Sequence, residues 1–402
     1  DRYHYQYISD KHPEEIEFSK DAIKIFTLDI ECSCENGFPD VENPIEELLC
    51  ITVKNQSNKQ IITWGTGDFE TKRQDVYYIK CNSEKQLIME FMKFWMKNYP
   101  DVITGWNTRF FDIPYIVNRI AGIGTEQAAR TLSPWNLVNE KNINSRGRTL
   151  PAYEIVGIQQ ADYLELFRKF GYSYGPQESY KLDHIGYVVV GEKKLSYEEH
   201  GNLYTLYKED HQKFIDYNIK DVQLVDRIDQ KMGLISLALT MAYKGGVNVQ
   251  DTFGTTAIWE SIIYRRLMSN NIVCPLEQIE KVPYKTVGER VYDDGSKADA
   301  VMGGYVKPPQ VGSHDWVVSF DLNSLYPHLM MQYNISPETL VEEKHPSVTI
   351  DKVLNQTVTF EMYKDYAVCA NGAMFRKDIK GFMPELMEKM YAERKIFKKK
   401  ML

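Results

Sequence analysis

The sequence lacks any run of about 18 apolar residues, the length that a helix needs to cross a membrane. Its six cysteines include no paired CxxC set of the kind that binds metals, and no secretory leader precedes Asp1. These absences argue against a membrane protein and against a disulfide-stabilised secreted domain. They predict an intracellular protein in a reducing compartment.

The sequence also lacks a net positive charge. Its formal net charge is -8, the opposite of what is typical of a simple nucleic-acid-binding protein. The charge is unevenly spread, because basic residues outnumber acidic ones between Arg376 and Leu402. Clustered carboxylates are also what a metal-dependent enzyme needs to cleave phosphodiesters. The acidic total therefore does not exclude an enzyme that acts on nucleic acid.

The chain is long enough for two or three domains. Its 402 residues exceed what one core usually organises, and a hydrophobic fraction of 43% is typical of a folded protein. Between residues 276 and 309 the composition shifts to Pro, Gly, Lys and Asp, which predicts a domain boundary. Both ends are expected to be cuts in a longer polypeptide, because the first residue is not Met and a helical pattern continues to Leu402.

Before this boundary the sequence has the pattern of an α/β domain. Runs rich in β-branched and aromatic residues predict strands. These strands cover residues 23–31, 48–53, 60–64, 76–80 and 101–104, and the first four suggest a meander. Helices are predicted after a capping box at Ser83, from near Phe111 and over 211–235, and residues 139–160 predict a protruding loop or hairpin.

Acidic residues recur at the ends of these elements. Asp29 and Glu31 stand two residues apart at the end of a strand, so their side chains point to the same side. Asp112 begins a helix, and Tyr217 and Asp221 share one face of the long helix. Each motif alone fits a solvated strand end, a helix-dipole acid or ordinary helix neighbours equally well. All three in order, each on the expected element, predict one site.

Carboxylates that are buried together repel one another, so divalent cations are their natural partners. We expect two Mg²⁺ or Mn²⁺ ions about 3.5 to 4 Å apart, which activate a water and stabilise a pentavalent phosphorus. Asp29 would bridge both ions. Glu31 and Asp221 would complete the ion that carries the water, and Asp112 would serve the other. Tyr217 would orient the water without ionising, since the ordinary pKa of a tyrosine is about 10.

This order of acids resembles the Asp-Glu-Asp-Asp-Tyr exonucleases of the ribonuclease H-like fold, which include proofreading domains. The resemblance implies a 3′→5′ exonuclease acting on single-stranded DNA. It also implies that Asn107 and Phe111 hold the frayed 3′ nucleotide, by hydrogen bond and stacking. Packing in the core is the alternative role for Phe111.

A second cluster follows the boundary. A strand predicted over 316–320 ends at Asp321, which suits a metal carboxylate, and a tight turn follows. The Ser324 hydroxyl and the Leu325 amide are available to phosphate oxygens. Tyr326 would lie against a sugar, and a buried aromatic beside a turn proline is the alternative for that residue.

The string Asp-x-x-Ser-Leu-Tyr-Pro, which starts at Asp321, resembles the first palm motif of the family B DNA polymerases. Residues 332–339 are similar to the replicative polymerases of T-even-like bacteriophages. Gly303, Gly304 and Tyr305 stand where this family links exonuclease to palm and touches template. The resemblance covers nearly the whole chain.

The resemblance implies roles for the second cluster. Asp321 would bind the polymerase metals, which are Mg²⁺, while Ser324 and Leu325 would hold the incoming dNTP. Tyr326 would be the steric gate that rejects a ribose 2′-hydroxyl.

Basic residues near the end match the fingers of the family. Arg394 and Lys398, one turn apart on a predicted helix, would grip the triphosphate, with a solvated helix face as the alternative. The second fingers motif, the later palm Asp-Thr-Asp-Ser and the thumb are missing. We therefore expect only the exonuclease site to be complete, and no primer extension by these 402 residues alone.

The implied fold is an α/β, ribonuclease H-like exonuclease domain followed by an incomplete α+β palm and the first fingers helix. The implied segments are an N-terminal remnant over 1–22, the exonuclease over 23–275, a linker over 276–312, a partial palm over 313–383 and a fingers helix over 384–402.

The resemblance also implies the partners and the location. These are single-stranded and primer-template DNA, dNTPs, a sliding clamp and other replisome proteins, in the cytoplasm of an infected bacterial host and without a membrane. Two alternatives stay open. The palm motif speaks against a stand-alone exonuclease acting on RNA or DNA, and the presence of all four acids speaks against a non-catalytic nucleic-acid-binding module.

Overall fold

The computed structural model describes residues 11, 19–145, 148–273, 306–358 and 364–401. The chain divides into two compact units, the first ending at residue 280 and the second starting at residue 281. The predicted N-terminal remnant and linker therefore lie mostly outside the described residues. Each unit is described by itself.

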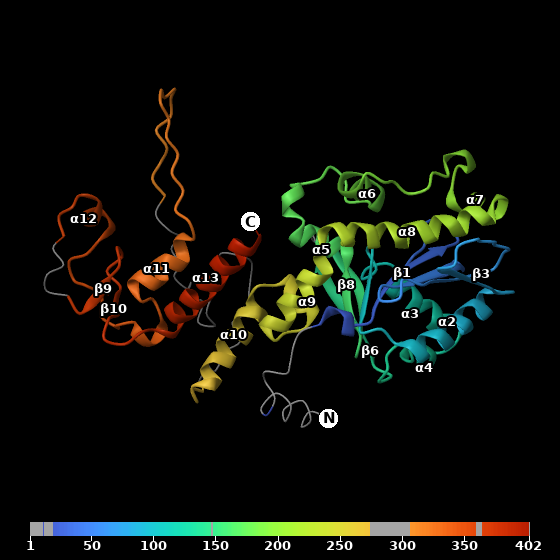
Figure 1. The fold of residues 1–402 in the computed structure, drawn as a ribbon, viewed down its shortest axis with the longest axis horizontal. Coiled ribbons are helices and arrows are strands. Elements are labelled where there is room, and N and C mark those ends of the chain that lie inside the picture. Colours follow the sequence, from blue (N-terminus) through green and yellow to red (C-terminus); the bar gives the residue numbers. More distant parts are fainter. Residues whose placement is uncertain (1–10, 12–18, 146–147, 274–305, 359–363, 402) are drawn as a thin grey trace, which may run out of the picture. The chain divides into compact units, whose positions relative to one another are not determined.

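The first unit is built around a six-stranded mixed sheet (Figure 1). Its strands are β1 (Ile25–Cys32), β2 (Leu48–Asn55), β3 (Ile61–Gly65), β4 (Val76–Lys80), β5 (Val102–Gly105) and β8 (Gln159–Asp162). Across the sheet they follow the order β4-β3-β2-β1-β5-β8. β1 pairs antiparallel with β2 and parallel with β5, which in turn pairs parallel with β8. The strand with the first two predicted acids is therefore central.

The predicted meander is confirmed for β1, β2 and β3 but is wrong for β4. β3 pairs antiparallel with β2, whereas β4 pairs parallel with β3. The reason lies in the connecting residues 66–75, which are attached to the start of a helix. The Gly67 amide donates to His211 at 3.1 Å, and the Glu70 amide donates to Gln212 at 2.9 Å. This attachment lets the chain return to the beginning of β3 before β4 starts.

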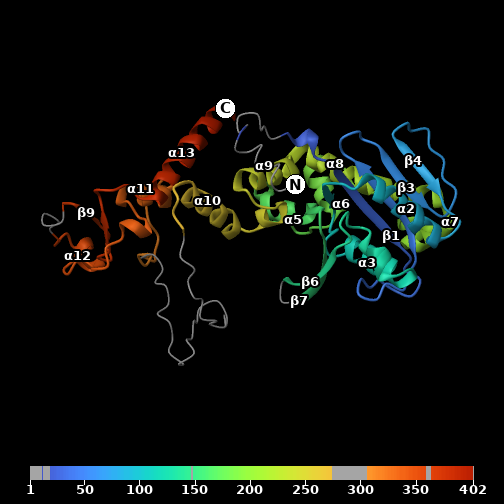
Figure 2. The same cartoon turned by 90° about the horizontal axis from the view of Figure 1, so that it is seen from below.

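Helices cover both faces of the sheet (Figures 1 and 2). α2 (Glu84–Asn98) and α3 (Asp112–Ile123) lie on one face, and α8 (His211–Met232) crosses the other. α2 begins at the predicted capping box, because the Ser83 hydroxyl accepts a hydrogen bond from the Gln86 amide. The elements that carry the predicted acids are thus the strand β1 of the sheet and the helices α3 and α8 on its two faces.

Alternation along β1 separates its apolar side chains from its acids. Phe26, Leu28 and Ile30 are buried in the core with α2 and α3. Asp29 and Glu31 have the opposite parity, so they face α8. Packing on one side of β1 therefore holds the carboxylates in place on the other side.

The remaining α-helices of this unit pack in both layers, the first of them against α3, and one hairpin protrudes. The helices are α4 (Glu126–Arg130), α5 (Tyr163–Phe170), α6 (Leu182–Val190), α7 (Leu203–Glu209), α9 (Leu234–Gly245) and α10 (Thr256–Ser269). The predicted hairpin is confirmed as β6 (Val138–Ser145) and β7 (Arg148–Ile155). The long helix predicted over 211–235 ends earlier, because Gly233 takes a left-handed φ of 66° that breaks α8 from α9.

The second unit is smaller and contains two short strands. Its elements are α11 (Leu325–Tyr333), α12 (Ile350–Leu354), β9 (Tyr366–Val368), β10 (Met374–Arg376) and α13 (Phe382–Met401). Asn334 ties them together: its amide donates to the carbonyls of Arg376 and Ile379, and its side-chain oxygen accepts from the Gly381 amide at 2.9 Å. The helix expected from residue 384 is α13.

The strand predicted over 316–320 is wrong. These residues are irregular, and Trp316 and Phe320 are almost fully exposed. A strand needs a partner for its backbone hydrogen bonds, and no strand of the described chain pairs with this segment. In the described part of the chain, moreover, no helix combines the length and apolar character that crossing a membrane requires.

A buried ion pair attaches α8 to the sheet and can be tested. Lys54 on β2 pairs with Asp226 on α8, and both side chains are buried. Replacing Asp226 with Asn leaves the ammonium without a countercharge, so we expect the free energy of unfolding to fall by about 3 to 5 kcal/mol. Unfolding in urea, followed by circular dichroism, measures this loss.

The control is Lys59, which is exposed and lies 3.9 Å from the same carboxylate. Lys59→Ala is expected to cost less than about 0.5 kcal/mol. Equal losses in the two variants would contradict a role of the Lys54 pair in holding α8.

Candidate active site

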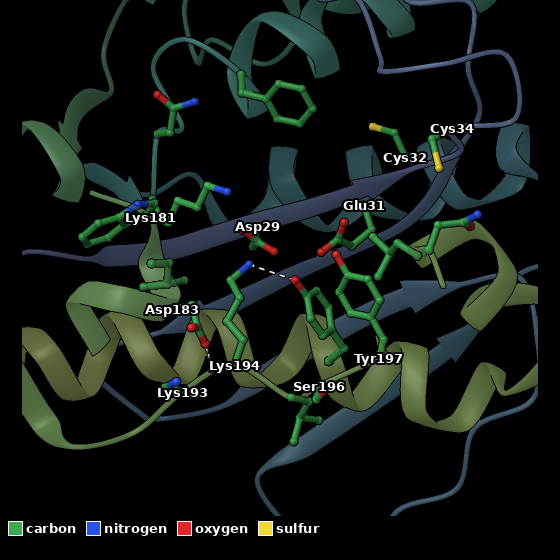
Figure 3. A pocket seen from close by; sticks show the side chains of 18 of the residues that line it. Asp29, Glu31, Cys32, Cys34, Lys181, Asp183, Lys193, Lys194, Ser196 and Tyr197 are labelled. Atoms are coloured by element: carbon green, nitrogen blue, oxygen red, sulfur yellow. Dashed lines mark hydrogen bonds between the residues drawn. The ribbon is translucent and has the colours of Figure 1, made fainter. Parts of the chain in front are cut away.

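A cavity of about 1170 Å³ opens where β1 faces α8. Asp29, Glu31 and Tyr217 line it, together with Asn107 and Phe111 from the loop after β5. Figure 3 shows Asp29 and Glu31 next to each other on β1, with their carboxylates directed into this space. Residues from three separate predicted motifs therefore meet at one cavity.

Three acids come close enough to share a cation. One carboxylate oxygen each of Asp29, Glu31 and Asp221 lie within 4.8 Å of one another. Asp221 is 1% exposed and projects from the middle of α8. One of its oxygens is buried without a hydrogen-bond partner in the described chain. An unpartnered buried carboxylate oxygen fits a ligand for a divalent metal.

Asp112 lies beside this group but outside it. It begins α3 and is 3% exposed, and its Oδ1 accepts a hydrogen bond from the Ile30 amide at 3.1 Å. Its charge raises the pKa of Asp29, which places the two carboxylates in electrostatic contact. One oxygen of Asp112 is thus used to tie α3 to β1.

Lys194 is a functional residue that the sequence did not reveal. It lies between α6 and α7, and its ammonium pairs with Asp221 and donates to the Tyr217 hydroxyl at 3.0 Å (Figure 3). Its own amide is held by Asp183 at 2.9 Å. No motif surrounds Lys194 in the sequence, so only the fold brings it to the site.

Asn218 is a second residue that was missed. It is fully buried on α8, and its amide donates to Asp29 Oδ2 at 2.6 Å. A signal for it existed, because Asn218 precedes Asp221 by three positions and so lies near it on the helix. Its hydrogen bond fixes the orientation of the Asp29 carboxylate.

Burial raises the pKa of all four carboxyls. The pKa of Glu31 rises to about 8, that of Asp112 to about 7 and that of Asp221 to about 6. The pKa of Asp29 is raised by burial and then by the charges of the other three acids. The Lys194 ammonium lowers the pKa of Glu31 and Asp221 without offsetting burial. Additional positive charge, beyond that of Lys194, would therefore stabilise the ionised carboxylates of this cluster.

Tyr217 and Lys194 keep their protons in this field. Burial and then the charge of Asp221 raise the pKa of the Tyr217 hydroxyl far above its ordinary value. Burial lowers the pKa of Lys194, but Asp221, Tyr217 and Glu31 outweigh it, so that the pKa is well above the ordinary value. The site thus presents a neutral phenol next to a fixed ammonium.

The loop after β5 places Asn107 and Phe111 at the cavity. It starts at Gly105, where a Cβ would lie 2.3 Å from the Leu28 carbonyl oxygen, so a larger residue does not fit. Asn107 has a left-handed φ of 67°. The Phe111 ring lies 5.9 Å from the Tyr115 ring and also lines the cavity. It therefore meets the core and the cavity at once.

The second predicted cluster lies in the second unit. Asp321 is exposed in an irregular segment, and among the described residues it belongs to no group of acids close enough to share an ion. Ser324 precedes α11 with a left-handed φ of 53°, and Leu325 is its first residue. Tyr326 is 80% exposed, so the alternative of a buried aromatic is wrong.

The remaining predicted residues belong to the end of the chain and to the predicted linker. Arg394 and Lys398 are exposed on α13, four positions apart. Gly303, Gly304 and Tyr305 lie outside the described residues.

Two family models match the chain. The model for the exonuclease domain of DNA polymerase family B matches residues 2–185, and the model for DNA polymerase family B matches residues 253–402. The chain belongs to the family B DNA polymerases. This confirms the resemblance drawn from the sequence.

Several family B polymerases are similar over nearly the whole chain. The DNA-directed DNA polymerases of Escherichia phage RB69 and Enterobacteria phage T4 are 31% and 29% identical to it, over 98% of this chain and 44% of each relative. The DNA polymerase of Pyrococcus glycovorans is 23% identical over 95% of this chain and 43% of its own length. The chain thus spans less than half the length of these relatives.

The two family B matches divide the site residues. Asp29, Glu31 and Asp112 lie within the exonuclease match, whereas Lys194, Tyr217 and Asp221 fall between the two matched regions. Geometry alone therefore joins α8 and the segment before it to the exonuclease residues.

The raised pKa values predict how metal-free stability changes with pH. Where the pKa of an acid is higher in the folded state than in the unfolded state, the protein loses stability as pH rises from the ordinary pKa to the folded pKa of that acid. For Glu31 and Asp112 this window runs from the ordinary values of 4.5 and 3.8 to about 8 and 7. In EDTA we expect a lower melting temperature at pH 8.5 than at pH 5.5, and Mn²⁺ should reverse that order.

The variant Glu31→Gln separates the site from the other titrating groups. Between pH 5.5 and pH 8.5 in EDTA, this variant should lose less stability than the unmodified chain, by at least about 1 kcal/mol. This corresponds to roughly 2 to 4 °C in melting temperature. Calorimetry at both pH values, with and without Mn²⁺, measures it. Identical pH profiles for the two proteins would contradict a repulsive carboxylate cluster.

Proposed function

We propose that the first unit is a two-metal 3′→5′ exonuclease of the ribonuclease H-like fold, which removes nucleotides from the 3′ end of single-stranded DNA. The observation that carries the proposal is the meeting of Asp29, Glu31 and Asp221, with Asp112 beside them. The sheet supports it, because β1, β2 and β3 are antiparallel to their neighbours among themselves, while β5 and β8 run parallel to β1. The acids lie on β1, between these two sets of strands.

The donor set fits divalent metals with oxygen ligands. Asp29, Glu31 and Asp221 would hold one ion, and Asp29 with Asp112 would hold the other. Bound Mg²⁺ or Mn²⁺ would activate the attacking water and stabilise charge on the phosphorus and the leaving oxygen. Asn218 keeps Asp29 in one orientation through its 2.6 Å hydrogen bond.

Tyr217 and Lys194 position the reacting groups without giving up their protons. The Tyr217 oxygen accepts from the Lys194 ammonium, so its own proton stays free for a hydrogen bond to the water. The ammonium is fixed by Asp221 and adds a positive charge at the edge of the cavity, where a phosphate would lie. Asn107 and Phe111 would bind the terminal nucleotide, by hydrogen bond and by stacking.

For the whole protein we propose DNA-directed DNA polymerase activity with proofreading, from its family B membership. The second unit would contribute part of the palm and the first fingers helix. The proposed divisions are an N-terminal remnant over 1–22, the exonuclease over 23–275, a linker over 276–312, a partial palm over 313–383 and a fingers helix over 384–402. DNA and dNTPs would be its substrates. A sliding clamp and other replisome proteins in the cytoplasm of a bacterial host would be its partners.

The second unit offers matching groups for this role. Asp321 would bind Mg²⁺. The Leu325 amide, at the start of α11, is one of the helix-terminal N–H groups that donate hydrogen bonds to phosphate oxygens. The exposed Tyr326 is free to meet a sugar. Arg394 and Lys398 would bind the triphosphate from α13.

Replacing Asp112 tests the exonuclease. Asp112→Asn keeps an oxygen that can accept from the Ile30 amide but removes the charge, so the fold should survive. We expect release of nucleotides from a 3′-labelled single-stranded DNA to fall at least about 10³-fold, equal to about 4 kcal/mol of transition-state stabilisation. Asp68→Ala removes an exposed acid that does not line the cavity, so it should leave the rate unchanged. Undiminished activity in Asp112→Asn would refute the site.

Matched DNA and RNA oligonucleotides separate the proposed function from a ribonuclease, because faster cleavage of RNA would favour the latter. A crystal soaked with Mn²⁺ separates it from a binding module. Two metal peaks near Asp29 are expected, and none at high Mn²⁺ would favour binding without catalysis.

A further inference from the structure

Asp162 is a buried carboxylate that the proposed chemistry does not use. It is the last residue of β8, next to Gly105 of β5 in the register of the sheet, and it is 1% exposed. Within the described chain no basic side chain forms an ion pair with it. Burial raises its pKa to about 6. A lone buried carboxylate is costly, which calls for a reason for its presence.

Backbone N–H groups from two segments surround this carboxylate. On one side it caps α5, because its Oδ1 accepts from the Leu164 amide at 2.9 Å. On the other side it holds the loop after β5, because the same Oδ1 accepts from the Asn107 amide at 3.2 Å and Oδ2 accepts from the Arg109 amide at 3.0 Å. One side chain thus joins a helix start to the loop that reaches the cavity.

The loop needs this support. Asn107 has a left-handed φ of 67°, which asparagine adopts more readily than most residues but at a cost. A second link runs from the Arg109 guanidinium to Glu165 on α5 at 2.8 Å. Both links fix the loop to α5, and the same loop carries Asn107 and Phe111 to the cavity.

We propose that Asp162 is a positioning residue for the 3′-terminal nucleotide, acting through Asn107 and Phe111. Its side chain does not line the cavity, and among the four acids its charge raises the pKa of Asp112. The proposal rests on the exonuclease function, and it deepens that function by naming what sets the position of the nucleotide-binding loop. A carboxylate is required because both of its oxygens accept from backbone N–H groups at once.

The variant Asp162→Asn tests the requirement with almost no change in volume. An asparagine has one accepting oxygen, so with that oxygen in the place of Oδ1 its NH₂ group faces the Arg109 N–H donor, and the Oδ2 link to the loop is lost. Ser83→Ala is the matched control, because it removes a helix cap from α2 on the other face of the sheet. Melting temperatures, Mn²⁺ affinity, and KM and kcat for excision from single-stranded DNA are measured for each protein.

Binding is measured separately from cleavage. Fluorescence anisotropy in EDTA reports the Kd for a labelled oligonucleotide with a phosphorothioate at its 3′ linkage. For Asp162→Asn we expect Kd and KM to rise about tenfold, with kcat and Mn²⁺ affinity nearly unchanged, since ground-state binding is what is lost. Ser83→Ala should lower the melting temperature and leave both constants alone.

A double variant shows whether Asp162 acts through the loop. If it does, adding Asn107→Ala to Asp162→Asn should raise KM little beyond the larger single effect, because the two changes remove one interaction. Multiplied effects, or a lower melting temperature with unchanged Kd and KM, would overturn the proposal. If the unmodified chain excises nothing, the proposed function fails, and a Kd that is equal in Asp162→Asn and the unmodified chain would overturn the role of Asp162 independently.

Discussion

Electrostatic repulsion among the buried carboxylates of β1, α3 and α8 is the constraint that the first unit has to satisfy. The fold meets it with few charges of opposite sign. Lys194 supplies one ammonium, Asn218 supplies a neutral donor, and the Ile30 amide takes one oxygen of Asp112. The rest of the structure keeps these groups together: apolar packing on the far side of β1 and a buried ion pair between β2 and α8 oppose the repulsion. A bound divalent cation would relieve this repulsion.

Much of this unit could be predicted, because its signals are local. Period-two alternation placed Asp29 and Glu31 on one side of β1, and helical spacing placed Tyr217 and Asp221 on one face of α8. The pairing of β4 could not be predicted, since it depends on how residues 66–75 attach to α8. Lys194 was invisible for the same reason: its role comes from a loop that crosses α8, and nothing in its neighbouring residues marks it.

The second unit shows where sequence pattern and structure disagree. The apolar run over 316–320 has the composition of a strand, yet no strand of the described chain pairs with it. Composition predicts that a segment can pair, and pairing itself needs a second segment. Helix α13, by contrast, was predicted close to its observed start because the helical pattern lies in its own residues, whereas the hydrogen bond from the Gly381 amide to Asn334, 47 residues away, was not predicted. Local contacts were predictable here, and distant ones were not.

The attachment of α8 at two places has a mechanical consequence. The Asn218 amide donates to Asp29 of β1 near the middle of the helix, and Asp226 pairs with Lys54 of β2 farther along. A rod held at two points on neighbouring strands can neither roll about its axis nor slide along it. Tyr217, beside Asn218 on the same helix, therefore keeps its position relative to Asp29. The helix also packs against α6 and α7, so its sequence is constrained on more than the face that meets the sheet.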